Sequence, residues 1–208
     1  MSRKLRTVAL AAALALPMSS QGSAQPPAHD PDWPCIQRKV PEMSAAQVWT
    51  GPDLETALQE WRSDRQIATL AGELAARRLP IEEAEAAIAS FAEGLDAAEK
   101  AEKLTLLFAG IFATLNSERG DVMVGIERYG RRQKDMAEDI RARQARLSDM
   151  RTASPDAPEV AAFNDQLLAE VRVFDERRAS LTYVCEVPTL IEQRLFALGR
   201  TIESELPN

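Results

Sequence analysis

The sequence has very few of the side chains from which most catalytic and metal sites are built. Among its 208 residues there are one histidine, His29, and two cysteines, Cys35 and Cys185. Nucleophilic triads need a histidine base, and di-iron bundles need Glu-x-x-His pairs. P-loop, G-x-G-x-x-G, G-x-S-x-G, EF-hand and C-x-x-C motifs are also missing. We therefore expect a protein that is not an enzyme, with no catalytic residues, no cofactor and no metal ligands.

Two charged clusters offer alternatives to that expectation. Glu82, Glu83 and Glu85 form the densest acidic group, as a paired-carboxylate hydrolase would require, but they follow Pro80 in a first helical turn, where the helix dipole favours acids. A basic cluster later in the chain would suit an anionic partner, yet acidic residues surround it, which is typical of a solvated helix face. Its members are Arg128, Arg131, Arg132 and Lys134.

The sequence is also poor in aromatic residues, which make up 5% of the chain. Its apolar residues are mainly Ala and Leu, a composition that favours helices over a β-sandwich. The formal net charge is −7, and without the first 24 residues it is −10, from 22 basic and 32 acidic side chains. Such a surface repels phosphate backbones, so we expect no nucleic-acid partner.

The N-terminal segment has the pattern of a secretory signal peptide. Arg3, Lys4 and Arg6 precede the apolar run Val8–Leu16, and small residues at 22 and 24 suit cleavage before Gln25. The alternative is a membrane anchor, but the run is about half the roughly 20 residues that span a bilayer. We expect a signal peptide at 1–24 and a periplasmic mature protein without a transmembrane segment.

Residues 25–52 are rich in proline and are expected to form an extended arm. Trp33 and Trp49 make this arm too apolar for a disordered linker, so we expect both to anchor it on the helices, the alternative being an exposed partner surface or ligand lid. In an oxidising compartment Cys35 and Cys185 are expected to form a disulfide. Two free thiols, or a metal pair with His29, are the alternatives.

Residues 53–208 show helical periodicity and are expected to form one bundle domain. The apolar stripe from Leu54 to Leu74 predicts a helical segment starting at Pro52, and a second segment runs from Ile81 to Gly94. A third starts near Ala97 and contains twelve uncharged residues, 104–115, which indicates a buried central helix.

After Gly120, apolar residues alternate at spacings of four and three, as along the contact line of a coiled coil. A second such line follows the prolines near residue 155. Folding the two together pairs residue 150 with 160 and 126 with 184, and it brings Arg143 and Glu170 within one layer, free to pair or to extend into solvent. Pro188 is expected to kink the second helix. The predicted fold is an all-α bundle with a long antiparallel hairpin at about 120–186.

For function, the sequence favours a non-enzymatic interaction protein, an adaptor, accessory or chaperone-like module that contacts another envelope protein. The alternative is a ligand-binding or sensory helical domain that holds an apolar small molecule between the 104–115 segment and the arm. An exposed apolar groove would favour the first hypothesis and an enclosed pocket the second.

The first prediction concerns processing. The mature chain should begin at Gln25 or within a few residues of it, because the small residues at 22 and 24 direct signal peptidase there. Mass spectrometry of protein from the envelope fraction measures this. A dominant species that retains Met1 would contradict the prediction.

Overall fold

The computed structural model describes residues 30–207. Within this range the chain is helical and has no β-strand. The expected signal peptide, its cleavage site and His29 lie outside the described residues and stay predictions. The all-α prediction is confirmed. The elements are the 3-10 turn η1 (Ala45–Gln47), α1 (Glu55–Glu60), α2 (Arg65–Ala75), α3 (Ile81–Glu93), α4 (Lys100–Ala153) and α5 (Pro158–Ser204).

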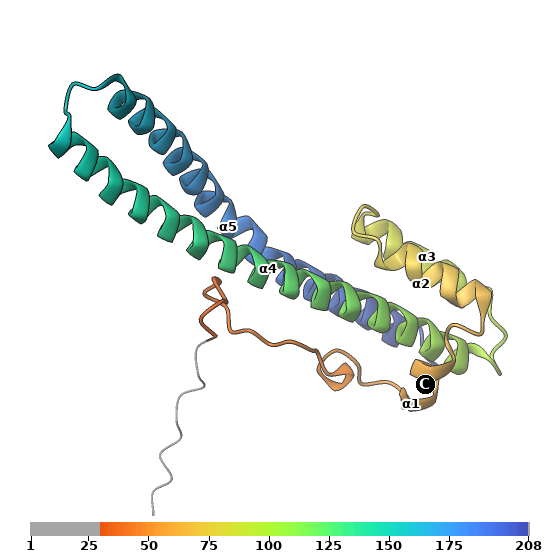
Figure 1. The fold of residues 1–208 in the computed structure, drawn as a ribbon. Helices are drawn as coiled ribbons and strands as arrows, with labels where there is room; N and C mark the ends of the chain where they lie inside the picture. The colour runs from red at the N-terminus through yellow and green to blue at the C-terminus, as the bar shows by residue number, and fades with distance from the viewer. Residues whose placement is uncertain (1–29, 208) are drawn as a thin grey trace, which may run out of the picture.

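Helices α4 and α5 form one long antiparallel hairpin (Figure 1). They contain 54 and 47 residues, which corresponds to about 80 and 70 Å at 1.5 Å per residue. Helix α2 packs on α4 and α3 packs on α5, both at the end away from the turn. We call residues 53–127 and 181–207 the base, residues 128–180 the outer hairpin, and residues 30–52 the arm.

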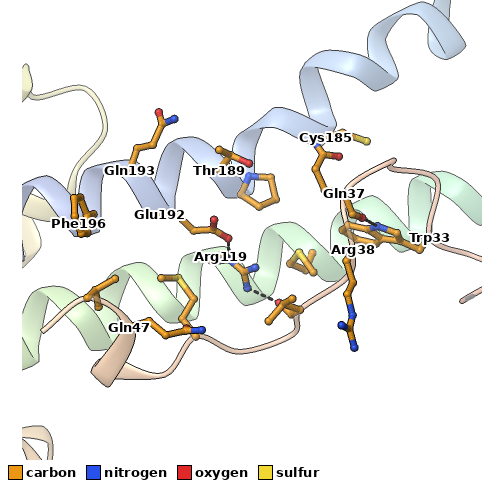
Figure 2. Close-up of a pocket in the computed structure, with 15 residues that line it drawn as sticks. Trp33, Gln37, Arg38, Gln47, Arg119, Cys185, Thr189, Glu192, Gln193 and Phe196 are labelled. Atoms are coloured by element: carbon orange, nitrogen blue, oxygen red, sulfur yellow. Dashed lines mark hydrogen bonds and ion pairs between the residues drawn. The ribbon is translucent and has the colours of Figure 1, made fainter. Parts of the chain in front are cut away.

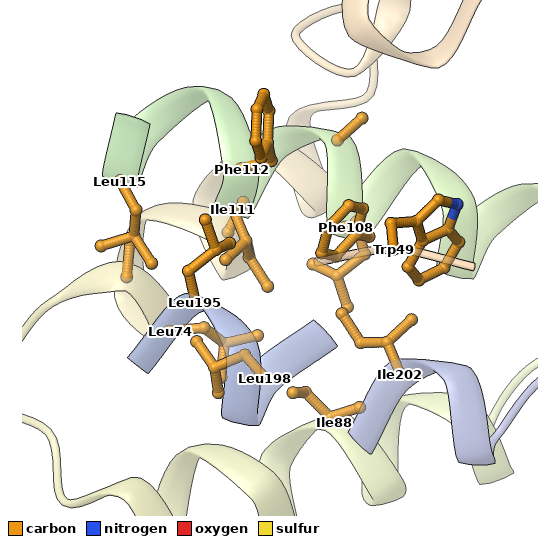
Figure 3. Close-up of a cluster of buried hydrophobic side chains, with 14 of the residues drawn as sticks. Trp49, Leu74, Ile88, Phe108, Ile111, Phe112, Leu115, Leu195, Leu198 and Ile202 are labelled. Carbon is orange, nitrogen blue, oxygen red and sulfur yellow. The ribbon is translucent and has the colours of Figure 1, made fainter. Parts of the chain in front are cut away.

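The base is built round a dry core between the two long helices and the short ones (Figure 3). The uncharged run 104–115 lies at its centre, as predicted, because five of its large side chains have no solvent exposure at all. Helices α2 and α3 cover the same core from one side, and Trp49 of the arm reaches it from another. The largest contributors include Leu74, Ile88, Phe108, Ile111, Leu115, Leu195, Leu198 and Ile202.

The predicted helix from Pro52 is wrong in its boundaries. Helix α1 starts three residues later, at Glu55, and it ends before Trp61. The Asp64 carboxylate then accepts hydrogen bonds from the backbone N–H groups of Gln66 and Ile67, at 3.0 and 3.1 Å, and so caps a new helix, α2. One apolar stripe extends over both helices because both pack against the same core.

The hairpin is longer than the predicted range of 120–186. The central helix predicted from Ala97 and the first helix of the hairpin are one element, α4, because Gly120 lies inside it without a break. Pro188 likewise lies inside α5 and does not divide it. A proline removes one helical hydrogen bond, but Ile191 and Leu195 after it are fully buried in the core, so packing keeps the helix continuous.

The predicted register agrees with the contacts across the hairpin. Met150 packs in the same apolar cluster as Val160, near the turn, and Ile126 packs in the same cluster as Val184, near the base. Arg143 Nη1 lies 2.9 Å from Glu170 Oε1, so these two side chains form an ion pair. Because both are about two-fifths exposed, this pair adds little stability.

Between those clusters the hairpin has a polar layer. Both amide atoms of Gln133 are buried without a hydrogen-bond partner among the described residues, which costs about 1–3 kcal/mol. One turn away, the Tyr129 hydroxyl donates a hydrogen bond to the Arg177 carbonyl at 2.6 Å. Near residue 133 the contact between the two helices is therefore partly polar, and it includes one unpaired amide.

The arm lies along the base and is joined to it covalently. A disulfide links Cys35 to Cys185, with the Cα atoms 5.6 Å apart, as predicted. Beside it the arm presses directly on α4 at Gly130, where an added Cβ would lie 2.3 Å from the Asp32 carbonyl oxygen. Only glycine permits this approach.

The other end of the arm enters the base core. The Trp49 ring stacks on Phe108, with the centroids 4.2 Å apart, and its indole N–H donates to the Pro52 carbonyl. Trp33, next to the disulfide, is equally buried. Both rings thus lie against the chain's own helices, as expected for anchors.

The second prediction concerns the disulfide. Replacing both Cys35 and Cys185 by Ser should lower the free energy of unfolding by about 4–5 kcal/mol, because a loop of this length is no longer closed in the unfolded chain. Trp33 should become accessible, whereas Trp49 stays stacked on Phe108. Denaturant unfolding measures the change in the free energy of unfolding. Acrylamide quenching measures the exposure of tryptophan, and the same double variant carrying Trp33→Phe shows how much of the quenching comes from Trp33. Loss of all helicity in buffer without denaturant would contradict the prediction.

Candidate binding groove

An open groove of about 540 Å³ lies where the arm crosses the two long helices. Figure 2 shows its two sides: Trp33, Gln37 and Gln47 come from the arm, and Thr189 and Gln193 come from α5. Helix α4 contributes the floor between them. The groove exists because the arm is extended here and cannot fill the angle between α4 and α5. Its apolar lining is Trp33, Val40, Met43, Val48, Met123, Pro188 and Phe196.

The charged residue of the floor is Arg119, whose side chain is only 5% exposed. Its Nε donates to Glu192 Oε1 at 2.7 Å, and its Nη1 donates to the carbonyls of Val40 and Pro41 at 2.7 and 3.3 Å. Figure 2 shows the guanidinium between the arm and α5. Arg119 therefore ties three segments together, while Nη2 is left without a hydrogen-bond partner among residues 30–207.

The ion pair in the groove is asymmetric. Arg119 is buried, but the Glu192 carboxylate is 38% exposed and is free to turn toward water. Arg38 stands at the outer edge and points away from Arg119 in Figure 2. Glu192 thus already neutralises Arg119, and Nη2 is the guanidinium donor that no group of residues 30–207 uses; a further anionic group is what such a donor binds best.

A second set of charges holds the start of the arm beside the groove. Lys39 donates to Asp30 at 2.7 Å and also pairs with Glu127, while Lys134 donates to Asp32 at 2.9 Å. The hydrogen bond from Lys39 holds the pKa of Asp30 below its usual value of 3.8, and the hydrogen bond from Lys134 does the same for the pKa of Asp32. All these groups are partly exposed, so they orient the arm more than they stabilise it.

The charged clusters seen in the sequence do not converge on the groove. Glu82 and Glu83 lie in the first turn of α3, as the helix-start interpretation predicts. In the basic cluster, Arg131 and Lys134 both bind Asp32 of the arm. Two of the four members of the cluster therefore pair with the arm.

Three residues that line the groove, Trp33, Cys185 and Pro188, were named from the sequence, but the charged and aromatic residues between them were not. Arg119 follows Leu115 by four residues and precedes Met123 by four, so it occupies a position on the apolar face of α4. A charged residue on the apolar face of a helix is therefore the feature of the sequence that could have marked Arg119. Nothing in the sequence marks Glu192 or Phe196, because their role depends on where the arm crosses α5.

The structure offers no centre for a metal. Within residues 30–207, no three or more His, Cys, Asp or Glu side chains gather in an arrangement that would hold an ion. In the same part of the chain, no helix combines the length and apolarity that crossing a membrane requires. The expectation that the protein carries no cofactor stays a prediction.

Comparison with known proteins adds no further assignment: no family model, no curated protein and no solved structure matches this chain. A function for this chain is therefore inferred from the geometry of the base, the groove and the hairpin.

The third prediction concerns Arg119. Arg119→Met keeps most of the side-chain volume but removes the donors to Val40, Pro41 and Glu192, which should cost about 1.5–3 kcal/mol. Residues 38–43 should then exchange amide hydrogens faster, while the helices exchange as before. Arg178→Met, at an exposed position of the outer hairpin, is the control and should stay within about 0.5 kcal/mol. Equal exchange in both variants would contradict a tethering role.

Proposed function

We propose that this chain is a non-enzymatic interaction protein of the cell envelope, and that its outer hairpin contacts another envelope protein. The observation that carries the proposal is the hairpin itself. Helices α1, α2 and α3 pack on the base, and no helix among the described residues covers the outer hairpin (Figure 1). Two paired helices of this length form a stiff projection, which suits holding or reaching a partner.

The charge distribution supports the same proposal. The arm and base, residues 30–127 and 181–207, carry 11 basic and 22 acidic side chains, whereas the outer hairpin carries 11 basic and 10 acidic ones. The projection is therefore nearly neutral beside a strongly acidic base. A partner with an acidic surface is repelled by the base and not by the hairpin, which favours contact at the outer end.

The outer hairpin also exposes apolar side chains. Leu168 and Val173 on α5 are both large and both exposed, although the layers between them and the turn are otherwise well packed. Scattered apolar residues are normal on a surface, and these two lie on a part of the molecule that no other helix of the described residues covers. They supply contact area without belonging to the hairpin's own core.

The rival hypothesis, an enclosed site for an apolar ligand between residues 104–115 and the arm, has less support. Trp49 occupies that space and stacks on Phe108. The hollow beside the arm is instead an open groove, which was the feature expected of an interaction protein. A disulfide between the arm and the hairpin supports export to an oxidising compartment.

The fourth prediction tests the hairpin. Removing residues 137–143 and 167–173 deletes one heptad from each helix, so the apolar contacts stay in phase and the projection shortens by about 10 Å. The shortened protein should keep its disulfide and its helical base but lose its partner. Quantitative mass spectrometry of cross-linked complexes purified from the envelope fraction measures the loss.

Leu190→Glu provides the matched control, because Leu190 is exposed on the base part of α5 and lies outside both the groove and the outer hairpin. It should retain the partner that the shortened protein loses. If the shortened protein recovers the same envelope proteins in the same amounts as the natural one, the hairpin is not the contact surface and the proposal is wrong.

A further inference from the structure

The groove continues along α5 beyond the arm. Thr189, Gln193 and Phe196 follow one another at spacings of four and three, so they lie on one face of the helix. Phe196 also borders a second hollow, of about 430 Å³, whose far wall includes Glu85 of α3. A single strip of α5 surface thus runs between the arm on one side and α3 on the other, with Phe196 in its middle.

The lining of this strip suits an extended peptide. Phe196 is 47% exposed although it is a large apolar residue, and Met43 of the same groove is an unbranched side chain that adapts to varied apolar groups. Gln37, Gln47 and Gln193 stand round the same space. Their amides can donate to and accept from peptide groups, whereas an alkyl chain would leave them unpaired.

Charge complementarity identifies which part of a peptide belongs here. Arg119 offers a buried guanidinium whose Nη2 has no partner among the described residues, at a point where the groove is open. A carboxylate is the group that such a donor binds best. An internal peptide segment with apolar side chains has no carboxylate, but a chain terminus has one.

We propose that this groove binds the carboxyl-terminal segment of a partner polypeptide. The terminal carboxylate receives a hydrogen bond from Arg119 Nη2, and the preceding apolar side chains pack on Phe196 and Met43. The disulfide and the contacts of Arg119 with Val40 and Pro41 hold the arm in place before the peptide arrives, so little ordering is needed on binding. The outer hairpin takes no part, and the proposal does not depend on the function assigned to it.

The experiment uses the mature, disulfide-bonded protein and a pool of fluorescein-labelled octapeptides. Their last four positions are drawn from Ala, Val, Leu, Met and Phe, and the pool is made once with free carboxyl ends and once with carboxamide ends. Peptides retained by the protein are remade singly, and their affinities are measured by fluorescence anisotropy. Free-acid peptides should be retained and should bind at least about tenfold more tightly than the matched amides.

Two variants locate the site. Phe196→Glu places a carboxylate in the groove and should weaken binding of the retained peptides at least about tenfold. Leu190→Glu makes the same change six residues earlier on α5. Leu190 is similarly exposed and lies outside the groove. It should bind the peptides as the natural protein does.

Three results would overturn the proposal. Acid and amide peptides that bind equally well would remove the role of Arg119, and binding that Phe196→Glu leaves unchanged would place the site elsewhere. Retention of no peptide at all, while dodecanoate binds and Phe196→Glu abolishes that binding, would show that the occupant is a fatty acid. The heptad-deleted protein should still bind the peptides, so failure here and failure of the hairpin proposal are separate outcomes.

Discussion

The antiparallel packing of α4 on α5 is the interaction on which the other parts of this molecule depend. The two helices bury Leu107, Ile111 and Leu195 completely at the base, and the shorter helices find their own apolar surfaces covered only because this pair is already in place. Short helices such as the six-residue α1 are not stable alone. The position of each short helix is therefore set by the part of the apolar surface of α4 or α5 that it covers.

The arm depends on the same pair in a different way. It has no regular structure apart from η1, and hence few backbone hydrogen bonds of its own. It is held instead by one covalent bond, by Arg119, by the lysine pairs at its start, and by Trp49 in the core. Such a segment keeps a fixed path without filling the space beside it, and this explains why the groove lies next to the arm rather than between two helices.

The two proposed surfaces differ in their physical character. The outer hairpin is thin, nearly neutral and far from the core. The buried, unpaired amide of Gln133 also weakens the packing between its two helices. The groove lies on the rigid base, next to a disulfide. A partner at the hairpin would meet two paired helices far from the core, whereas a peptide in the groove would meet a surface that the disulfide holds in place.

The sequence by itself determined the helical class, the disulfide and the register of the hairpin, because each depends on short-range periodicity or on a choice among very few residues. With only two cysteines a single intramolecular pairing exists, and the spacing of apolar residues places Ile126 opposite Val184. Helix boundaries were harder to predict, since glycine and proline, as at Gly120 and Pro188, are residues at which helices often end. Packing against the core overrides those rules.

Only the tertiary structure decided where the groove lies. Arg119 lies on α4, far along the chain from Glu192 and Phe196 on α5, and the three residues share one groove because α4 and α5 pack antiparallel and the disulfide-linked arm crosses beside them. The path of an extended segment over a helix pair leaves no periodic trace in the sequence. It depends on single close approaches such as Asp32 on Gly130, and those exist only once the chain has folded.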